Sequence, residues 1–218
     1  MARRREFLAQ LGMAAAAIAF DADEMRAASV APIGSPWDTS WLDRLAAAQY
    51  RVVFNASDIA DGAAMAYAST FFDHFHEAHG TSDAQTRPVI VFRRMGTSMA
   101  LNDMLWEKYR IGEDRKIDDP ATHAPATRNV FWKAAPGASP ESVATKIETL
   151  RKRGMISLVC NIAAMNVGYS LAQKSGRDVE EVRQEVKANL VPGAILVPSG
   201  IYALIRAQNA GCAFMQGT

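Results

Sequence analysis

One cysteine in this sequence stands where an apolar run ends and a polar loop begins. Cys160 closes the run MISLVC (155–160) and is followed at once by Asn161. A thiol at such a position is strongly nucleophilic, and the N–H groups at the start of a following helix can stabilise an anion. The chemistry predicted is nucleophilic attack or sulfur acceptance by Cys160. The alternative is that Cys160 is a small apolar residue packed beneath a loop.

Residues at other predicted strand ends could bind an anion. Arg93 and Arg94 end a second apolar run, and guanidinium groups bind carboxylates and oxyanions; the alternative is a pair of solvated charges. Ser199 and Gly200 follow a third run, where N–H groups could bind an anion or Ser199 could simply cap a helix. Ligands of open parallel sheets bind beyond the carboxyl ends of the strands. The expected site is therefore Cys160 as the nucleophile, with Arg93, Arg94, Asn161, Ser199 and Gly200 as binding residues.

The remaining motifs predict neither a metal site nor a cofactor. His74, His76 and His79 stand at i, i+2 and i+5, whereas zinc-binding helices place two histidines at i and i+4. The two cysteines are too few for a disulfide scaffold and lack zinc spacing. No glycine-rich phosphate loop follows the first apolar run. We therefore expect no metal and no nucleotide cofactor.

Compact apolar runs alternate along the chain with segments of helical periodicity. Strands are expected at 49–57, 87–94, 155–160, 194–199 and 212–216. Helices are expected at 62–80, 98–112, 139–154, 162–175, 178–190 and 201–210. This alternation predicts an α/β fold in which a mainly parallel sheet is covered on both faces, as a three-layer sandwich.

The two thiols are not expected to form a disulfide. Cys160 ends one predicted strand and Cys212 begins another. In parallel strands these positions lie at opposite edges of the sheet, more than about 10 Å apart. A disulfide requires Cα atoms within about 7 Å. Only an antiparallel last strand, adjacent to the third, would allow a bridge.

Residues 1–30 are typical of an export signal. Three arginines at 3–5 precede an apolar stretch at 8–20, which is short for a bilayer-spanning helix. The pattern Arg4-Arg5-x-Phe7-Leu8 resembles twin-arginine signals. We expect the signal to be removed, leaving a periplasmic protein without a stable membrane anchor. The alternative is an amphipathic basic helix at the membrane surface.

Length and composition predict a single domain at 36–218. The chain has 218 residues, 49% hydrophobic and 22% charged, and a net charge of +1, which argues against nucleic-acid binding. One long insertion at 113–138 is charged and then rich in Pro, Ala and Thr. A connection of this length is unusual, and we expect a lid, an interface arm or an edge element that exposes Phe131 and Trp132.

The second half of the chain resembles the DsrE/DsrF-like family, which has the YchN-like fold. In that family a basic residue and glycine precede a strand that ends in cysteine, as Arg153-Gly154 precede Cys160 here. A later strand runs into Val-Pro-Ser-Gly (197–200), followed by a helix with Leu204 and Gln208. The match covers about 142–216, is looser over 50–110, and does not include the signal or the insertion.

The resemblance implies a five-stranded α/β sandwich that assembles into trimers or hexamers. In some members the matched cysteine carries a persulfide and passes sulfur to a partner, and other members have no known activity. This chain departs from the pattern in its export signal and in Cys212, where an aromatic residue is common. Two functions are therefore expected: an exported sulfur carrier or sulfurtransferase using Cys160, or a non-catalytic oligomeric binding module of a periplasmic complex.

Overall fold

Five parallel strands form the centre of the computed structural model, which describes residues 36–218. They are β1 (Tyr50–Ala56), β2 (Thr86–Phe92), β3 (Ile156–Cys160), β4 (Ile195–Val197) and β5 (Ala213–Gln216). Their order in the sheet is β4-β3-β2-β1-β5, and every neighbouring pair is parallel. The predicted α/β class and all five strands are confirmed. The predicted export signal lies outside the described residues.

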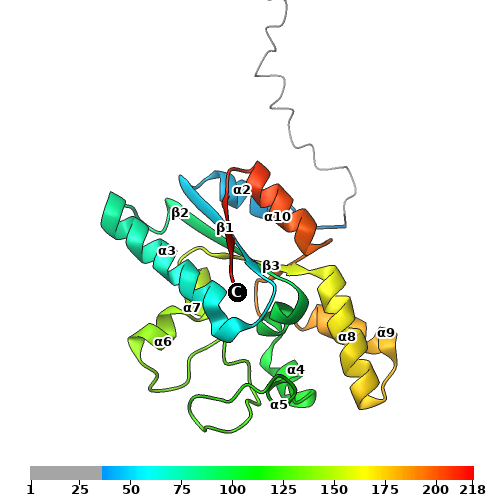
Figure 1. Cartoon of the computed structure of the whole chain (residues 1–218). Coiled ribbons are helices and arrows are strands. Elements are labelled where there is room, and N and C mark those ends of the chain that lie inside the picture. The colour runs from blue at the N-terminus through cyan, green and yellow to red at the C-terminus, as the bar shows by residue number, and fades with distance from the viewer. Residues whose placement is uncertain (1–35) are drawn as a thin grey trace, which may run out of the picture. The chain divides into compact units, whose positions relative to one another are not determined.

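Alternate side chains of each strand point into two separate cores. On one face, α2 (Trp41–Ala46) and α10 (Gly200–Asn209) pack over residues such as Val53, Val89 and Leu158. On the other face, α3 (Ala63–His79), α7 (Ile147–Lys152) and α8 (Asn161–Ser175) pack over Phe54, Phe92 and Val159. Figure 1 shows α2 and α10 on the side of the sheet opposite α3, α7 and α8. The apolar runs lack polar alternation because both faces are buried.

The chain order explains this division of helices. From β1 to β4 each new strand is added on the same side of its predecessor, and the chain then returns through α10 to place β5 beside β1. Connections between parallel strands are right-handed. When the next strand is added in the opposite direction across the sheet, its connecting helix therefore lies on the opposite face. The carboxyl ends of β2, β3 and β4 consequently lie side by side at one edge.

The predicted helix at 98–112 is wrong as a single element. The segment forms a 3₁₀ helix η2 (Arg94–Ala100) and two short helices, α4 (Asp103–Lys108) and α5 (Ile111–Arg115). Asn102 has an extended backbone, and its side chain accepts a hydrogen bond from the Leu105 N–H at 3.1 Å, which starts a new helix. The left-handed backbone of Arg110, with φ 50°, then separates α4 from α5.

The other helices follow the predicted pattern with one further break. The predicted helix at 139–154 is two helices, α6 (Pro140–Ala144) and α7, because Lys146 has an extended backbone between them. The remaining elements are the 3₁₀ helix η1 (Ala60–Gly62) and α9 (Val179–Ala188). Ser139 and Asp178 cap α6 and α9 through side-chain oxygens. No helix within 36–218 is both long enough and apolar enough to cross a membrane.

The expectation that the insertion exposes Phe131 and Trp132 is wrong. These side chains are only 8% and 7% exposed and belong to the larger core, where the Phe131 ring lies 6.1 Å from the Trp106 ring. Asn129 holds this part of the insertion in place: its Nδ2 donates to the carbonyls of Met99 and Leu101, and its Oδ1 accepts from the Phe131 N–H. The insertion therefore extends the core.

Both cysteines are free and buried, which confirms that they are not bonded to each other. Cys160 ends β3, whereas Cys212 immediately precedes β5. β2 and β1 lie between those strands. At about 4.8 Å per strand the separation across the sheet alone is about 14 Å. Because β5 is parallel to the other strands, Cys160 and Cys212 also lie at opposite edges of the sheet, which increases their separation further.

Candidate functional site

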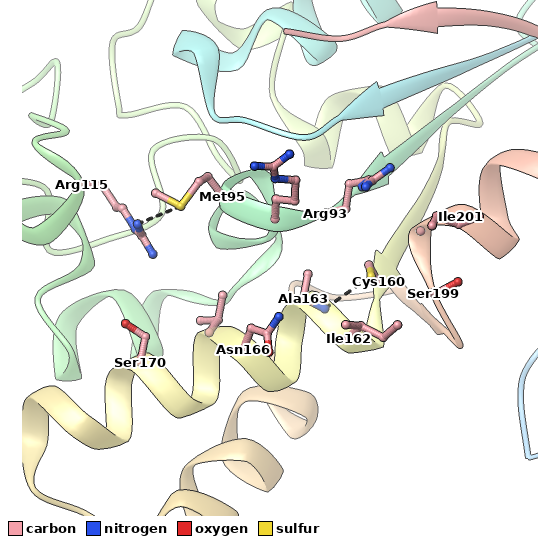
Figure 2. A pocket seen from close by; sticks show the side chains of 13 residues that line it. Arg93, Met95, Arg115, Cys160, Ile162, Ala163, Asn166, Ser170, Ser199 and Ile201 are labelled. Atoms are coloured by element: carbon pink, nitrogen blue, oxygen red, sulfur yellow. Dashed lines mark hydrogen bonds between the residues drawn. The ribbon is translucent and has the colours of Figure 1, made fainter.

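The carboxyl ends of β2, β3 and β4 surround a cavity of about 500 Å³. Five of the six predicted site residues line it: Arg93, Arg94, Cys160, Ser199 and Gly200. They come from three separate strand ends that only the parallel topology brings together. Figure 2 shows Cys160 at the end of its strand, with Ser199 and Ile201 on the next connection and α8 running away beneath.

Cys160 belongs to both β3 and the start of α8. Its Sγ caps the helix by accepting a hydrogen bond from the Ala163 N–H at 3.4 Å. The residue is 6% exposed, and it lines the cavity, so the small exposed part of the residue lies at the cavity. The capping N–H is positioned to stabilise negative charge on sulfur, and the cavity gives a reactant access.

Arg93 and Arg94 lie where β2 passes into η2. Within residues 36–218 neither side chain has a hydrogen bond or an ion pair. Arg94 has a left-handed backbone with φ 49°, which costs about 1–2 kcal/mol for a residue with a Cβ. Such strain persists where surrounding structure holds it, often at functional sites. Both arginines therefore line the same cavity as Cys160 without an ion pair in the described part of the chain.

Ser199 and Gly200 form the start of α10. The Ser199 Oγ accepts a hydrogen bond from the Tyr202 N–H at 3.0 Å, so Ser199 caps the helix, the alternative stated for it. Gly200 packs closely against Arg93: a Cβ there would lie 3.0 Å from Cδ and 3.2 Å from Cβ of that side chain, which would have to move by a few tenths of an ångström. The start of α10 and Arg93 therefore lie in contact at the edge of the cavity.

Asn161 is the one predicted binding residue that does not line the cavity. It is the first residue of α8 and is half-buried. The face of α8 that lines the cavity is formed instead by Ala163, Asn166, Val167 and Ser170. Asn166, Val167 and Ser170 follow Ala163 by three, four and seven residues, the spacing of one helical face. The predicted helix at 162–175 was therefore enough to place these four residues on one face.

Met95 and Arg115 complete the cavity and were not predicted. Met95 follows Arg94 and is 41% exposed. Arg115 ends α5 inside the segment predicted as an insertion. Its Nη1 donates to Met95 Sδ at 3.2 Å. Arg115 brings the arginines at the cavity to three, and no carboxylate is among the described lining residues.

The histidines of α3 have structural partners. His76 Nε2 lies 3.2 Å from Asp83 Oδ1, and the His79 ring stacks on Tyr50 at 5.2 Å between centroids. Among residues 36–218 there is no group of three or more His, Cys, Asp or Glu side chains that could hold a metal ion. The described chemistry therefore centres on one thiol and three guanidinium groups.

Comparisons with known proteins give no function for this chain. No protein-family model matches the sequence, and no curated protein matches it. Among solved structures the chain is similar to a protein of unknown function, MTH1491 from Methanobacterium thermoautotrophicum. The identity is 16%, the TM-score is 0.39, and the alignment covers 77% of this chain and 98% of that one. The chemistry of the site is therefore argued from its own residues.

Proposed function

We propose that this protein is an exported member of the DsrE/DsrF-like family that accepts sulfane sulfur on Cys160 and passes it on. The observation that carries the proposal is the thiol at a cavity that contains three arginines and, within 36–218, no acidic lining residue. The family resemblance of the strand-end cysteine and of the 197–200 turn supports it. Export rests on the Arg4-Arg5 pattern and the apolar stretch at 8–20.

The proposed reaction needs no cofactor. The Cys160 thiolate attacks the outer sulfur of a persulfide or polysulfide, a new S–S bond forms to Cys160, and the old S–S bond breaks. The departing thiolate takes the electron pair of that bond and is protonated by the proton that Cys160 released. A second nucleophile reverses the step. The Ala163 N–H and the guanidinium groups of Arg93 and Arg94 stabilise the sulfur anions that occur before and after transfer.

A cyanide assay tests this function. Protein loaded with polysulfide and freed of excess reagent is expected to release one thiocyanate per chain on adding cyanide, because cyanide removes the outer sulfur of a persulfide. Cys160→Ser should release none. Cys212→Ser, which alters the other buried thiol, should behave as the wild type. Thiocyanate release that survives Cys160→Ser would overturn the proposal.

A second candidate function is a non-catalytic binding module within a larger assembly. It is favoured by exposed apolar side chains on α10 and β5, where Ile201 and Ile205 are 61% and 52% exposed and Phe214 and Met215 are each 49% exposed. These residues would pack against a partner whether or not Cys160 reacts. The open, arginine-lined cavity favours the sulfur-transfer function, because a binding module has no need of it.

A further inference from the structure

The cavity extends well beyond the thiol that the proposed function uses. Its floor is the face of α8 from Cys160, which caps the helix, to Ser170. At 1.5 Å per residue that face is about 15 Å long. The volume of about 500 Å³ is that of a site for an organic molecule, whereas an inorganic sulfane such as thiosulfate has its sulfurs only about 2 Å apart.

The end of the cavity far from the thiol contains an incompletely satisfied cation. In Figure 2, Arg115 and Ser170 lie at the end opposite Cys160, with Met95 and Asn166 between. Arg115 is 16% exposed in its side chain, donates from Nη1 to a thioether, and has its Nε 3.5 Å from Asp114 Oδ2 without a hydrogen bond. A thioether is a weak acceptor, and Asp114 also pairs with Lys174.

The lining between the two ends is largely apolar. Ala163 and Val167 are buried on the α8 face, and Met95 lies across from them. Ile162 and Ile201, which are 57% and 61% exposed, also line the cavity on either side of the Cys160 connection. A reactant that spans the cavity would therefore have a reactive sulfur at one end, an apolar middle, and an anion at the other end.

We infer that the sulfur donor is an organic persulfide with an apolar chain and a terminal anionic group, which Arg115 binds. This inference rests on the proposed function and adds the substrate class. In the reaction, R–S–SH and the Cys160 thiol give Cys160–S–SH and R–SH: the Sγ–S bond forms as the R–S–S bond breaks, and no external oxidant or reductant is needed. An anion about 10–15 Å from the sulfur would reach Arg115.

A series of donors of graded length tests the distance between thiol and cation. The probes are freshly prepared persulfides of mercaptopropionate, mercaptohexanoate and mercaptoundecanoate, each compared with its hydroxyl analogue of equal length. An extended chain advances about 1.2 Å per bond, so only the longest carboxylate reaches Arg115. Intact mass measures the rate at which one sulfur atom is added. For the longest pair, we expect the carboxylate to transfer sulfur to Cys160 about tenfold faster than the alcohol. A tenfold rate ratio corresponds to the free energy of about one charged hydrogen bond.

Variants at the far end separate this inference from the proposed function. Arg115→Gln should abolish the preference for the longest carboxylate over its hydroxyl analogue, and Arg115→Lys should restore part of that preference. Arg110→Gln is the matched control, because Arg110 is 76% exposed in its side chain and pairs with Glu113 outside the cavity. If the carboxylate and the alcohol load Cys160 at equal rates for every chain length, and Arg115→Gln changes nothing, the inference about the donor is overturned while the proposed function still stands. Loading by no donor would overturn the proposed function as well.

Discussion

At the scale of single residues, the two cysteines have similar exposure and opposite surroundings. Cys160 is 6% exposed and lines the cavity, whereas Cys212 is 7% exposed and lies in the core formed by α2, α10 and one face of the sheet. Burial raises the pKa of Cys212 to about 11, with only partial opposition from the charge of Arg51. A neutral thiol without access to a reactant is inert, so the fold separates one available sulfur from one sequestered sulfur.

Alkylation should therefore distinguish the two thiols. Iodoacetamide at about pH 8 is expected to modify one cysteine per folded chain, and peptide mapping should place the label on Cys160. Cys212 should react only after unfolding, because burial keeps it protonated and out of reach. Native labelling of Cys212 in preference to Cys160 would contradict this assignment.

At the scale of elements, the polar contacts of the insertion and of α4 hold the far wall of the cavity. Asn129 is 1% exposed, and its Nδ2 lies 2.7 Å from the Met99 carbonyl and 2.6 Å from that of Leu101. Glu185 of α9 accepts hydrogen bonds from Tyr109 and Arg177, and Lys108 also pairs with it. These contacts fix α4 and, through the chain, α5, which carries Arg115.

Replacing Asn129 by Asp tests the role of the insertion. The carboxylate oxygen that replaces Nδ2 would face two carbonyl oxygens with no donor, so Asn129→Asp should lower the free energy of unfolding by about 3 kcal/mol or more. Asn129→Ala removes the same donors without burying a charge and should cost less. Urea unfolding of both variants measures the difference. A smaller loss in Asn129→Asp than in Asn129→Ala would contradict the described hydrogen bonds.

The Glu185 contacts predict a dependence of stability on pH. Burial opposes ionisation, but hydrogen bonds from Lys108, Tyr109 and Arg177 outweigh it and lower the pKa of Glu185 from 4.5 to about 2. Because the pKa is lower in the folded state, the stabilisation is complete above about pH 4.5 and is lost as the pH falls towards 2. Glu185→Gln should cost about 2 kcal/mol at neutral pH, and the deficit should shrink at about pH 3. Urea unfolding at both pH values checks this, and a constant deficit would refute it.

The parts of the site predicted from sequence are those that local patterns determine. An apolar run that ends in a polar residue marks a strand end, and parallel topology then brings Arg93, Cys160 and Ser199 to one edge. Arg115 could not be predicted, because its position depends on the short α5 and on the packing of an irregular segment. The helix predicted at 98–112 is interrupted because the Asn102 side chain caps a new helix. The apolar periodicity of the segment gives no sign of this break.

At the scale of the whole molecule, the sheet ends in an uncovered edge strand. Among residues 36–218, β5 pairs only with β1, and all four of its residues are exposed. Open edges of this kind invite pairing with another chain. The burial of Phe131 and Trp132 removes the insertion aromatics as an interface. β5 combines an open edge with exposed apolar side chains, Phe214 and Met215, and is therefore a candidate surface for assembly.

We predict that the protein is a homo-oligomer, a trimer or hexamer as the family resemblance implies, with β5 at its interface. Light scattering at micromolar concentration should give a multiple of the chain mass. Phe214→Lys should dissociate the assembly, because a lysine on an edge strand prevents pairing. Tyr169→Lys, which alters a 50% exposed aromatic residue on α8, is the control and should leave the mass unchanged. A stable wild-type monomer would contradict the prediction.

The central claim is that the strand-end thiol accepts sulfane sulfur, and intact mass spectrometry tests it most directly. Wild-type protein, Cys160→Ser and Cys212→Ser are incubated with polysulfide, separated from the reagent and measured without reductant. The account predicts a mass increase of whole sulfur atoms in the wild type and in Cys212→Ser, reversed by dithiothreitol, and none in Cys160→Ser. An unchanged wild-type mass, or an equal increase in Cys160→Ser, would contradict it.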